Sequence, residues 1–176
     1  KRFDQFASLV PIFKPLTVVC HTAYDHKRYW PVRKQWLENS LEIWEPLATA
    51  FVLAGTRLML ENVYEKTPLE ILPLLENLKP HGVGFCLDIG HQAVFGTVSL
   101  SQWVKAMSRH LQQLHLHDNN GEWDDHWALG KGNIDIQRLF KDLDSRKIRP
   151  LAVTLEPHRE EDLRPSLEYL KPIWPW

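Results

Sequence analysis

Apolar side chains recur along this chain with two different spacings. In residues 2–13 and 33–54 they stand three and four positions apart, which is the pattern of an amphipathic helix. Other apolar runs are only four or five residues long, and these are typical of strands that are buried on both faces. Such strands are predicted at 16–20, 57–60, 83–87, 113–116 and 151–155. The pattern therefore predicts a helix followed by five strand–helix units.

The starts of two helices carry local signals. Thr67, Pro68 and Glu70 form a capping box with proline at the first helical position, and Asp135 can cap the helix that follows it. The helices after the five strands are predicted at 33–54, 67–78, 101–110, 136–145 and 160–171, with polar loops at 22–31 and 89–98. Strands that alternate with helices indicate an α/β fold with a parallel sheet, here in one domain over residues 1–176.

Composition narrows the kind of protein. Of the 176 residues, 44% are hydrophobic and 24% are charged, and the formal net charge is −1, which argues for a globular domain without a broad nucleic-acid footprint. No apolar run reaches the roughly 18 residues of a membrane span, so neither a secretory leader nor a membrane partner is expected. Cys20 and Cys86 lie within predicted strands, which favours reduced, buried thiols and a cytoplasmic location.

Every predicted strand ends at a side chain that can bind a metal ion. The five residues are His21, Glu61, Asp88, His115 and Glu156. Taken alone, each is more often a helix cap, a loop salt bridge or an ordinary histidine. Carboxylates crowded at one edge of a parallel sheet, however, repel one another unless a cation neutralises them. Glu61, Asp88, His115 and Glu156 therefore predict a divalent metal site suited to zinc, manganese or cobalt.

A second group of possible ligands follows the fourth strand. Asp124 and His126 can face one ion together, and His91 is a natural third ligand; the alternative is a solvated acidic loop. The remaining histidines are interpreted as structural, and His117 is placed in this class on the ground that it points away from His115. The structural class comprises His26, His81, His110, His117 and His158.

Two features of the same region favour contact with a substrate. Residues 129–135 form a glycine-rich segment that opens a helix, where backbone N–H groups and Lys131 can bind an anion; a plain turn explains the glycines equally well. Trp123 and Trp127 flank the acidic loop. Their rings suit stacking on an apolar sugar face, and packing of the loop is the alternative.

Four motifs occur together in this chain. They are GFCLDIGH at 84–91, His-Leu-His-Asp from His115, Asp-x-His ahead of LGKGNID, and Leu-Glu-Pro around Glu156. Together they resemble the xylose isomerase-like barrel superfamily, which includes sugar isomerases, sugar epimerases and the abasic-site endonuclease IV. The resemblance covers about residues 18–156 and implies a parallel (β/α) TIM barrel. That barrel has eight strand–helix units, so the first three strands have no counterpart here, and upstream residues or a second chain in a homo-oligomer are expected to cover the gap.

The resemblance also implies roles for the matching residues. A central metal is held in every branch of the superfamily by the residues at Glu61, Asp88, His115 and Glu156. In the endonuclease branch a second zinc is held at His91, Asp124 and His126, and a third at His21, so one to three ions are expected. In the sugar branch Glu61 and Glu156 are also the catalytic acid/base pair, and His91 contacts the sugar.

Three functions are compatible with this set of residues. The favoured function is a sugar or sugar-phosphate isomerase or epimerase, in which a proton moves through a metal-stabilised enediolate. A zinc-dependent phosphodiesterase acting on abasic DNA is the first alternative, and a non-catalytic metal-binding barrel fragment is the second. Duplex binding depends on Lys and Arg placed against phosphates, and no basic stripe lies near the predicted strand ends, which favours the sugar enzyme.

Overall fold

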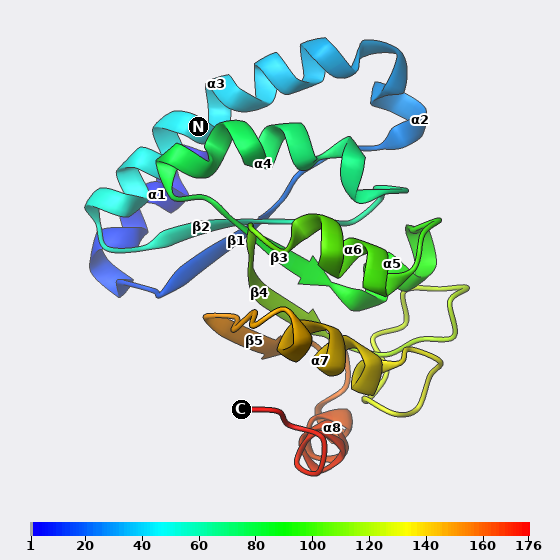
Figure 1. Ribbon diagram of the computed structural model, residues 1–176. Helices are drawn as coiled ribbons and strands as arrows, with labels where there is room; N and C mark the ends of the chain where they lie inside the picture. Colours follow the sequence, from blue (N-terminus) through cyan, green and yellow to red (C-terminus); the bar gives the residue numbers. More distant parts are fainter. Residues whose placement is uncertain (1) are drawn as a thin grey trace.

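The computed structural model describes residues 2–176 and shows a curved sheet of parallel strands that alternate with helices (Figure 1). The strands lie in the order of the sequence and are β1 (Thr17–His21), β2 (Arg57–Glu61), β3 (Gly84–Asp88), β4 (Leu111–Leu116) and β5 (Ala152–Leu155). The α-helices are α1 (Arg2–Phe13), α2 (His26–Tyr29), α3 (Arg33–Leu53), α4 (Leu72–Leu78), α5 (Ile89–Phe95), α6 (Leu100–Met107), α7 (Ile136–Ser145) and α8 (Leu163–Leu170). Short 3₁₀ helices occupy Trp30–Val32, Pro68–Glu70, Lys79–His81 and Glu160–Asp162. This architecture is the partial α/β TIM barrel that the sequence predicts.

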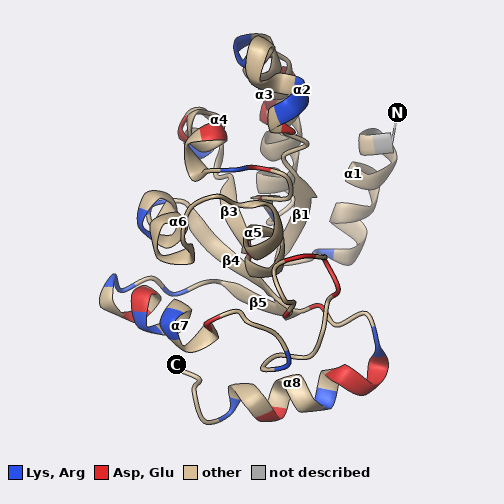
Figure 2. Ribbon diagram, turned by 90° about the vertical axis from the view of Figure 1, so that its right-hand side faces the viewer, with Lys and Arg blue, Asp and Glu red and all other residues tan. Residues whose placement is uncertain are grey.

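The helices α3, α4, α6 and α7 form an arc over one face of the sheet, and the other, lumenal face opens between α1 and α8 (Figure 2). The hydrophobic core fills the space between the sheet and this arc, and its fully buried side chains include Leu60, Phe85, Leu87 and Trp103. Within the described residues β1 and β5 each pair with one strand only, so the sheet has two unpaired edges. No helix among residues 2–176 is both long and apolar enough to cross a membrane.

Two segments that were predicted as loops contain helices. Residues 22–31 include α2, which Asp25 caps by accepting a hydrogen bond from the N–H of Lys27 at 2.9 Å. Residues 89–98 include α5, which Asp88 caps by accepting a hydrogen bond from the N–H of His91 at 2.7 Å. Helices of one or two turns show too little of the helical period to be recognised from sequence. His91 therefore lies in the first turn of a helix and not on a loop.

Strand β4 contains one extra residue relative to β3. Phe85 pairs with Leu111, but the next residue of β3, Cys86, pairs with Gln113, which leaves Gln112 as a bulge. Beyond the bulge the register brings His115 opposite Asp88. Paired residues of neighbouring strands face the same side of a sheet, so these two ligand candidates share the lumenal face.

Both cysteines are free thiols, as predicted. Cys86 is buried, whereas Cys20, on the edge strand β1, is only partly buried. Burial raises the pKa of Cys86 to about 12 and that of Cys20 to about 11. Both side chains are therefore protonated, unreactive groups at neutral pH.

Glu65 is a carboxyl group buried behind the ends of β1 and β2. Its side chain accepts hydrogen bonds from the Thr22 hydroxyl and from the N–H of Val63, the latter at 2.6 Å, and only 1% of the residue is exposed. Burial outweighs these hydrogen bonds and raises the pKa of Glu65 from its ordinary value of 4.5 to about 7. The folded protein thus keeps a proton that the unfolded chain releases in this pH window, and stability falls as the pH rises through it.

We expect the Glu65→Gln variant to lose this part of the pH dependence. The wild-type free energy of unfolding should fall, relative to that of the variant, by about 3 kcal/mol between pH 4.5 and pH 7, because one pKa unit corresponds to about 1.4 kcal/mol. Urea unfolding at a series of pH values measures the difference, with the exposed Glu42→Gln substitution on α3 as the control. Parallel pH profiles for wild type and Glu65→Gln would show that Glu65 is ionised in the folded state.

Candidate metal centre

Four of the predicted ligand residues meet at the carboxyl ends of β2 to β5. Each offers one ligand atom, and these atoms all lie within 4.8 Å of one another. The group, termed the central cluster, consists of Glu61 on β2, Asp88 on β3, His115 on β4 and Glu156 just after β5. The first three are buried and Glu156 is half-buried. The order of the parallel strands makes successive strand ends neighbours, which is why residues far apart in sequence converge here.

The imidazole of His115 faces two carboxylates of the central cluster. Its Nδ1 lies 3.0 Å from Oε1 of Glu156 and 3.3 Å from Oε1 of Glu61. This buried nitrogen nevertheless has no hydrogen-bond partner among the described residues. A ring nitrogen directed between carboxylates suits a shared cation, and three carboxylates with one imidazole are a common donor set for divalent metals. The residues of the central cluster therefore fit a divalent ion.

Opposite charges stabilise one another within the central cluster. Burial alone would raise the pKa of Glu61, but the imidazoles of His115 and His91 lower it to about 2. Burial alone would lower the pKa of His115, but the Cys86 thiol and the carboxylates of Glu156 and Glu61 raise it to about 12. A metal ion bound at His115 would take the place of this proton, so metal uptake would be coupled to proton release.

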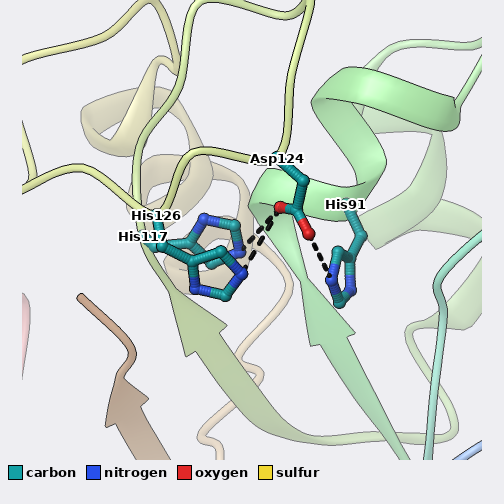
Figure 3. Close-up of side chains that lie close together, drawn as sticks. All are labelled: His91, His117, Asp124 and His126. Atoms are coloured by element: carbon teal, nitrogen blue, oxygen red, sulfur yellow. Dashed lines mark ion pairs between the residues drawn. The ribbon is translucent and has the colours of Figure 1, made fainter. Parts of the chain in front are cut away.

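A second cluster lies beside the first and surrounds Asp124 with three imidazoles (Figure 3). Asp124 Oδ2 lies 3.2 Å from Nε2 of His91, and Oδ1 lies 3.4 Å from Nε2 of His126 and 3.8 Å from Nε2 of His117. Buried Oδ1 of Asp124 has no hydrogen-bond partner among the described residues. The structure thus brings together the three predicted ligands of a second ion and adds His117 to them.

The same balance of burial and charge acts in the second cluster. Burial lowers the pKa of His91, but the carboxylates of Asp124 and Glu61 raise it to about 11. The pKa of Asp124 lies well below its usual range, because the imidazoles of His126 and His91 outweigh the effect of burial. The carboxylate of Asp124 is therefore ionised at neutral pH.

Backbone carbonyl groups orient two of these imidazoles. Nδ1–H of His91 donates to the carbonyl oxygen of Asn62 at 3.0 Å, and Nδ1–H of His126 donates to that of Glu156 at 2.7 Å. Asn62 is itself fixed, because its side chain exchanges two hydrogen bonds with the backbone of Asp88, at 2.9 and 3.0 Å. With the proton held on Nδ1, Nε2 of each ring is available to bind an ion.

The position of His117 corrects a prediction. Its Nε2 lies 3.0 Å from Oδ1 of Asp88, and its ring stacks on His126 with a centroid distance of 3.6 Å. His126 stacks in turn on His158 at 3.8 Å. Side chains two positions apart on a strand point to the same side, so the argument that turned His117 away from His115 was wrong. The His-x-His spacing was itself the signal that both rings face one site.

The other predicted site residues lie around the two clusters with different degrees of exposure. His21 is 62% exposed in its side chain, and its Nε2 lies 3.8 Å from Oε2 of Glu61 at the open edge of the sheet. Trp123 is 72% exposed on the loop after β4. Nζ of Lys131 lies 2.5 Å from the buried carboxylate of Asp162. The roles of His21 as a metal ligand and of Trp123 and Lys131 in substrate binding stay predictions.

The glycine-rich segment binds a side chain of the protein itself. Buried Asp118 accepts hydrogen bonds from the N–H groups of Gly130, Gly132 and Ile134 at 2.9, 3.0 and 3.2 Å. A Cβ at Gly132 would lie 2.2 Å from the carbonyl oxygen of Asn119, so a side chain does not fit there. These N–H groups donate to Asp118 and are not available to a bound anion, which corrects the predicted anion-binding role of the segment. The segment instead closes the loop that carries the second cluster.

Fold and site together define a class of protein: a parallel barrel with carboxylates and imidazoles gathered at the carboxyl ends of its strands. The sequence model of the xylose isomerase-like TIM barrel family matches residues 14–173. The chain therefore belongs to this family, as the motifs predict.

The chain is also similar to individual proteins. The uncharacterized protein MJ1614 of Methanocaldococcus jannaschii is 32% identical over 127 residues, which are 68% of this chain and 47% of MJ1614, so the chain spans about half of that relative. A D-tagatose 3-epimerase-like protein of known structure shares 22% identity with a TM-score of 0.82, over 96% of this chain and 65% of its own. The TTHB071 protein from Thermus thermophilus, in a structure obtained by soaking with ZnCl2, shares 26% identity with a TM-score of 0.81, over 98% of this chain and 67% of its own.

Proposed function

We propose that this protein is a divalent-metal-dependent sugar or sugar-phosphate isomerase or epimerase. The observation that carries the proposal is the convergence of the central cluster, in which Nδ1 of His115 faces the carboxylates of Glu61 and Glu156 without a hydrogen bond of its own. The likeness to a D-tagatose 3-epimerase-like protein supports a sugar as the substrate. The ZnCl2 soak of the TTHB071 structure supports zinc as one candidate metal.

The carboxylates of Glu61 and Glu156 are the proposed acid/base pair. They come from the ends of β2 and β5, and both approach Nδ1 of His115. One carboxylate removes a proton from a carbon next to the sugar carbonyl, and the other returns a proton. When bound, a divalent ion supplies the positive charge that stabilises the negative charge left on the substrate oxygens.

Three further residues are proposed as substrate contacts. His91 lies between the two clusters, 3.4 Å from Glu61 and 3.2 Å from Asp124, and is placed to donate to a sugar hydroxyl. The exposed ring of Trp123 offers a stacking surface for the apolar face of a sugar. The Lys131 ammonium, more than half exposed beside Asp162, is the candidate partner for a phosphorylated sugar.

A zinc-dependent phosphodiesterase on abasic DNA is the second candidate function, because His91, Asp124 and His126 gather as a second possible metal site. The distribution of charge argues against a DNA substrate. About half of the Lys and Arg residues lie on helices around the sheet, whereas the loop after β4 is acidic, with Glu122, Asp124 and Asp125 (Figure 2). Duplex binding relies on basic groups that neutralise phosphates, so the sugar substrate is preferred.

Metal loading followed by two assays separates the candidates. We expect elemental analysis of the full chain, loaded with zinc, manganese or cobalt and then gel-filtered, to find at least about one divalent ion per chain. The loaded protein should epimerise or isomerise ketohexoses such as D-tagatose, and a chelator should abolish this activity. Chelator-sensitive nicking of an abasic-site duplex without sugar turnover would support the phosphodiesterase. A protein that takes up no metal would contradict both.

A further inference from the structure

Three histidines, His91, His126 and His115, differ in which ring nitrogen faces the carboxylates of their own cluster. In His91 and His126 a backbone carbonyl accepts the proton of Nδ1, so Nε2 faces the site. In His115 the arrangement is reversed, because Nδ1 faces the carboxylates of Glu61 and Glu156. For Nδ1 to bind an ion, the proton of the neutral ring has to sit on Nε2, and that N–H needs an acceptor.

The side chain of Gln113 lies at this nitrogen. Gln113 is only 4% exposed, and its carboxamide nitrogen lies 3.2 Å from Nε2 of His115 and 3.4 Å from Oγ1 of Thr154. The carbonyl oxygen of the carboxamide is buried without a hydrogen-bond partner among the described residues, and a half-turn of the group exchanges the positions of this oxygen and the nitrogen. Gln113 precedes His115 by two positions on β4, so both side chains enter the lumen, with the carboxamide one layer below the ring.

A half-turn of the carboxamide decides which nitrogen of His115 carries the proton. With the NH2 group toward the ring, Nε2 must accept, and the proton of a neutral ring is left on Nδ1, where it blocks an ion. With the carbonyl oxygen toward the ring, Nε2–H donates to it, the Thr154 hydroxyl can donate to the same oxygen, and Nδ1 is free. Only the second orientation is compatible with a metal ligand at Nδ1.

We propose that Gln113 is a positioning residue for the central cluster: its carbonyl oxygen accepts the hydrogen bond of His115 Nε2–H and so holds the ring with Nδ1 ready for a divalent ion. This inference rests on the proposed metal site. Gln113 thus does with a side chain what the carbonyls of Asn62 and Glu156 do for His91 and His126. Loss of such a partner of a metal-binding histidine typically weakens metal binding by about 10- to 100-fold.

The Co²⁺ affinity of the full chain, measured by competition with a chromophoric chelator, tests the proposal. Gln113→Met removes the acceptor with little change of shape, and we expect it to bind Co²⁺ about 10- to 100-fold more weakly than wild type. Gln113→Glu keeps an acceptor oxygen and should stay within a few-fold of wild type, with the same Co²⁺ visible absorption spectrum. The matched control is Gln112→Met, because the neighbouring carboxamide accepts from Arg57 at 3.2 Å and not from His115.

Equal Co²⁺ affinity in wild type and Gln113→Met would overturn the inference and leave the metal site standing. Gln113→Glu binding as weakly as Gln113→Met would overturn it as well, because an acceptor oxygen would then not be what the site requires. If Gln113→Met does not fold, Gln113→Lys, which offers a donor but no acceptor, takes its place with the same expected loss. Absence of Co²⁺ uptake by the wild type would instead contradict the proposed metal site itself.

Discussion

Replacing Glu156 by glutamine is expected to lower the turnover of sugar substrate by about 10²- to 10⁴-fold, the usual contribution of a general acid or base. The substitution keeps the size of the side chain but removes the charge and the proton-accepting oxygen that lies 3.0 Å from Nδ1 of His115. The backbone carbonyl of Glu156, which holds His126, is unaffected by the change. The second cluster should therefore persist, and the loss should be confined to the central cluster.

Steady-state kinetics of the metal-loaded protein, together with its metal content and thermal unfolding, measure this effect. We expect a fall in kcat with little change in the unfolding temperature, because Glu156 is only half-buried and a neutral amide is no harder to bury. Glu160→Gln, an exposed substitution four residues further on, is the control. Full turnover by Glu156→Gln would exclude Glu156 from the acid/base pair.

Replacing Asp118 by alanine is expected to destabilise the folded protein by about 4 kcal/mol, since hydrogen bonds to a charged group contribute roughly 1.5–3 kcal/mol each and do not add fully. The carboxylate accepts four backbone N–H groups, from Asn119, Gly130, Gly132 and Ile134. Alanine leaves these donors without their acceptor in a site that excludes water. The loop that carries Asp124 and His126 should loosen first, and with it the second cluster.

Urea unfolding and limited proteolysis of the loop measure the two consequences of the Asp118 substitution separately. Glu122→Ala lies on the same loop but is exposed, and it should change the free energy of unfolding by less than about 0.5 kcal/mol. We expect new cleavage sites within residues 119–133 in Asp118→Ala alone. A loss of stability below about 1 kcal/mol would mean that water or neighbouring groups replace the carboxylate.

The strands and long helices could be predicted from the sequence because their apolar periods are long enough to identify them. The predicted strands agree with the observed ones to within two residues, and the capping signals at Thr67 and Asp135 mark real helix starts. The short helices α2 and α5 were missed because a single capping hydrogen bond, and not an apolar face, determines where each begins.

The gathering of the central cluster also followed from the sequence, since parallel strands of one sheet present their carboxyl ends to the same edge. Other parts of the site depend on contacts that spacing does not reveal. The N–H groups of the glycine-rich segment point into the protein, because they donate to the carboxylate of Asp118, which precedes the segment in the chain. The contact of Gln113 with His115 depends on the rotation of the His115 ring, and a pattern of residue types does not predict that rotation.

The bulge at Gln112 sets the register of β4 and so determines which of its side chains reach the site. If Gln112 paired with Cys86 instead of bulging, Leu114 rather than His115 would stand opposite Asp88, because Phe85 pairs with Leu111 below it. The apolar side chains of β4 would then enter the lumen, and the histidine would turn into the hydrophobic core. Deleting Gln112 alone should therefore leave a regular ladder in which His115 still stands opposite Asp88, so that the bulge is lost and the site keeps its imidazole.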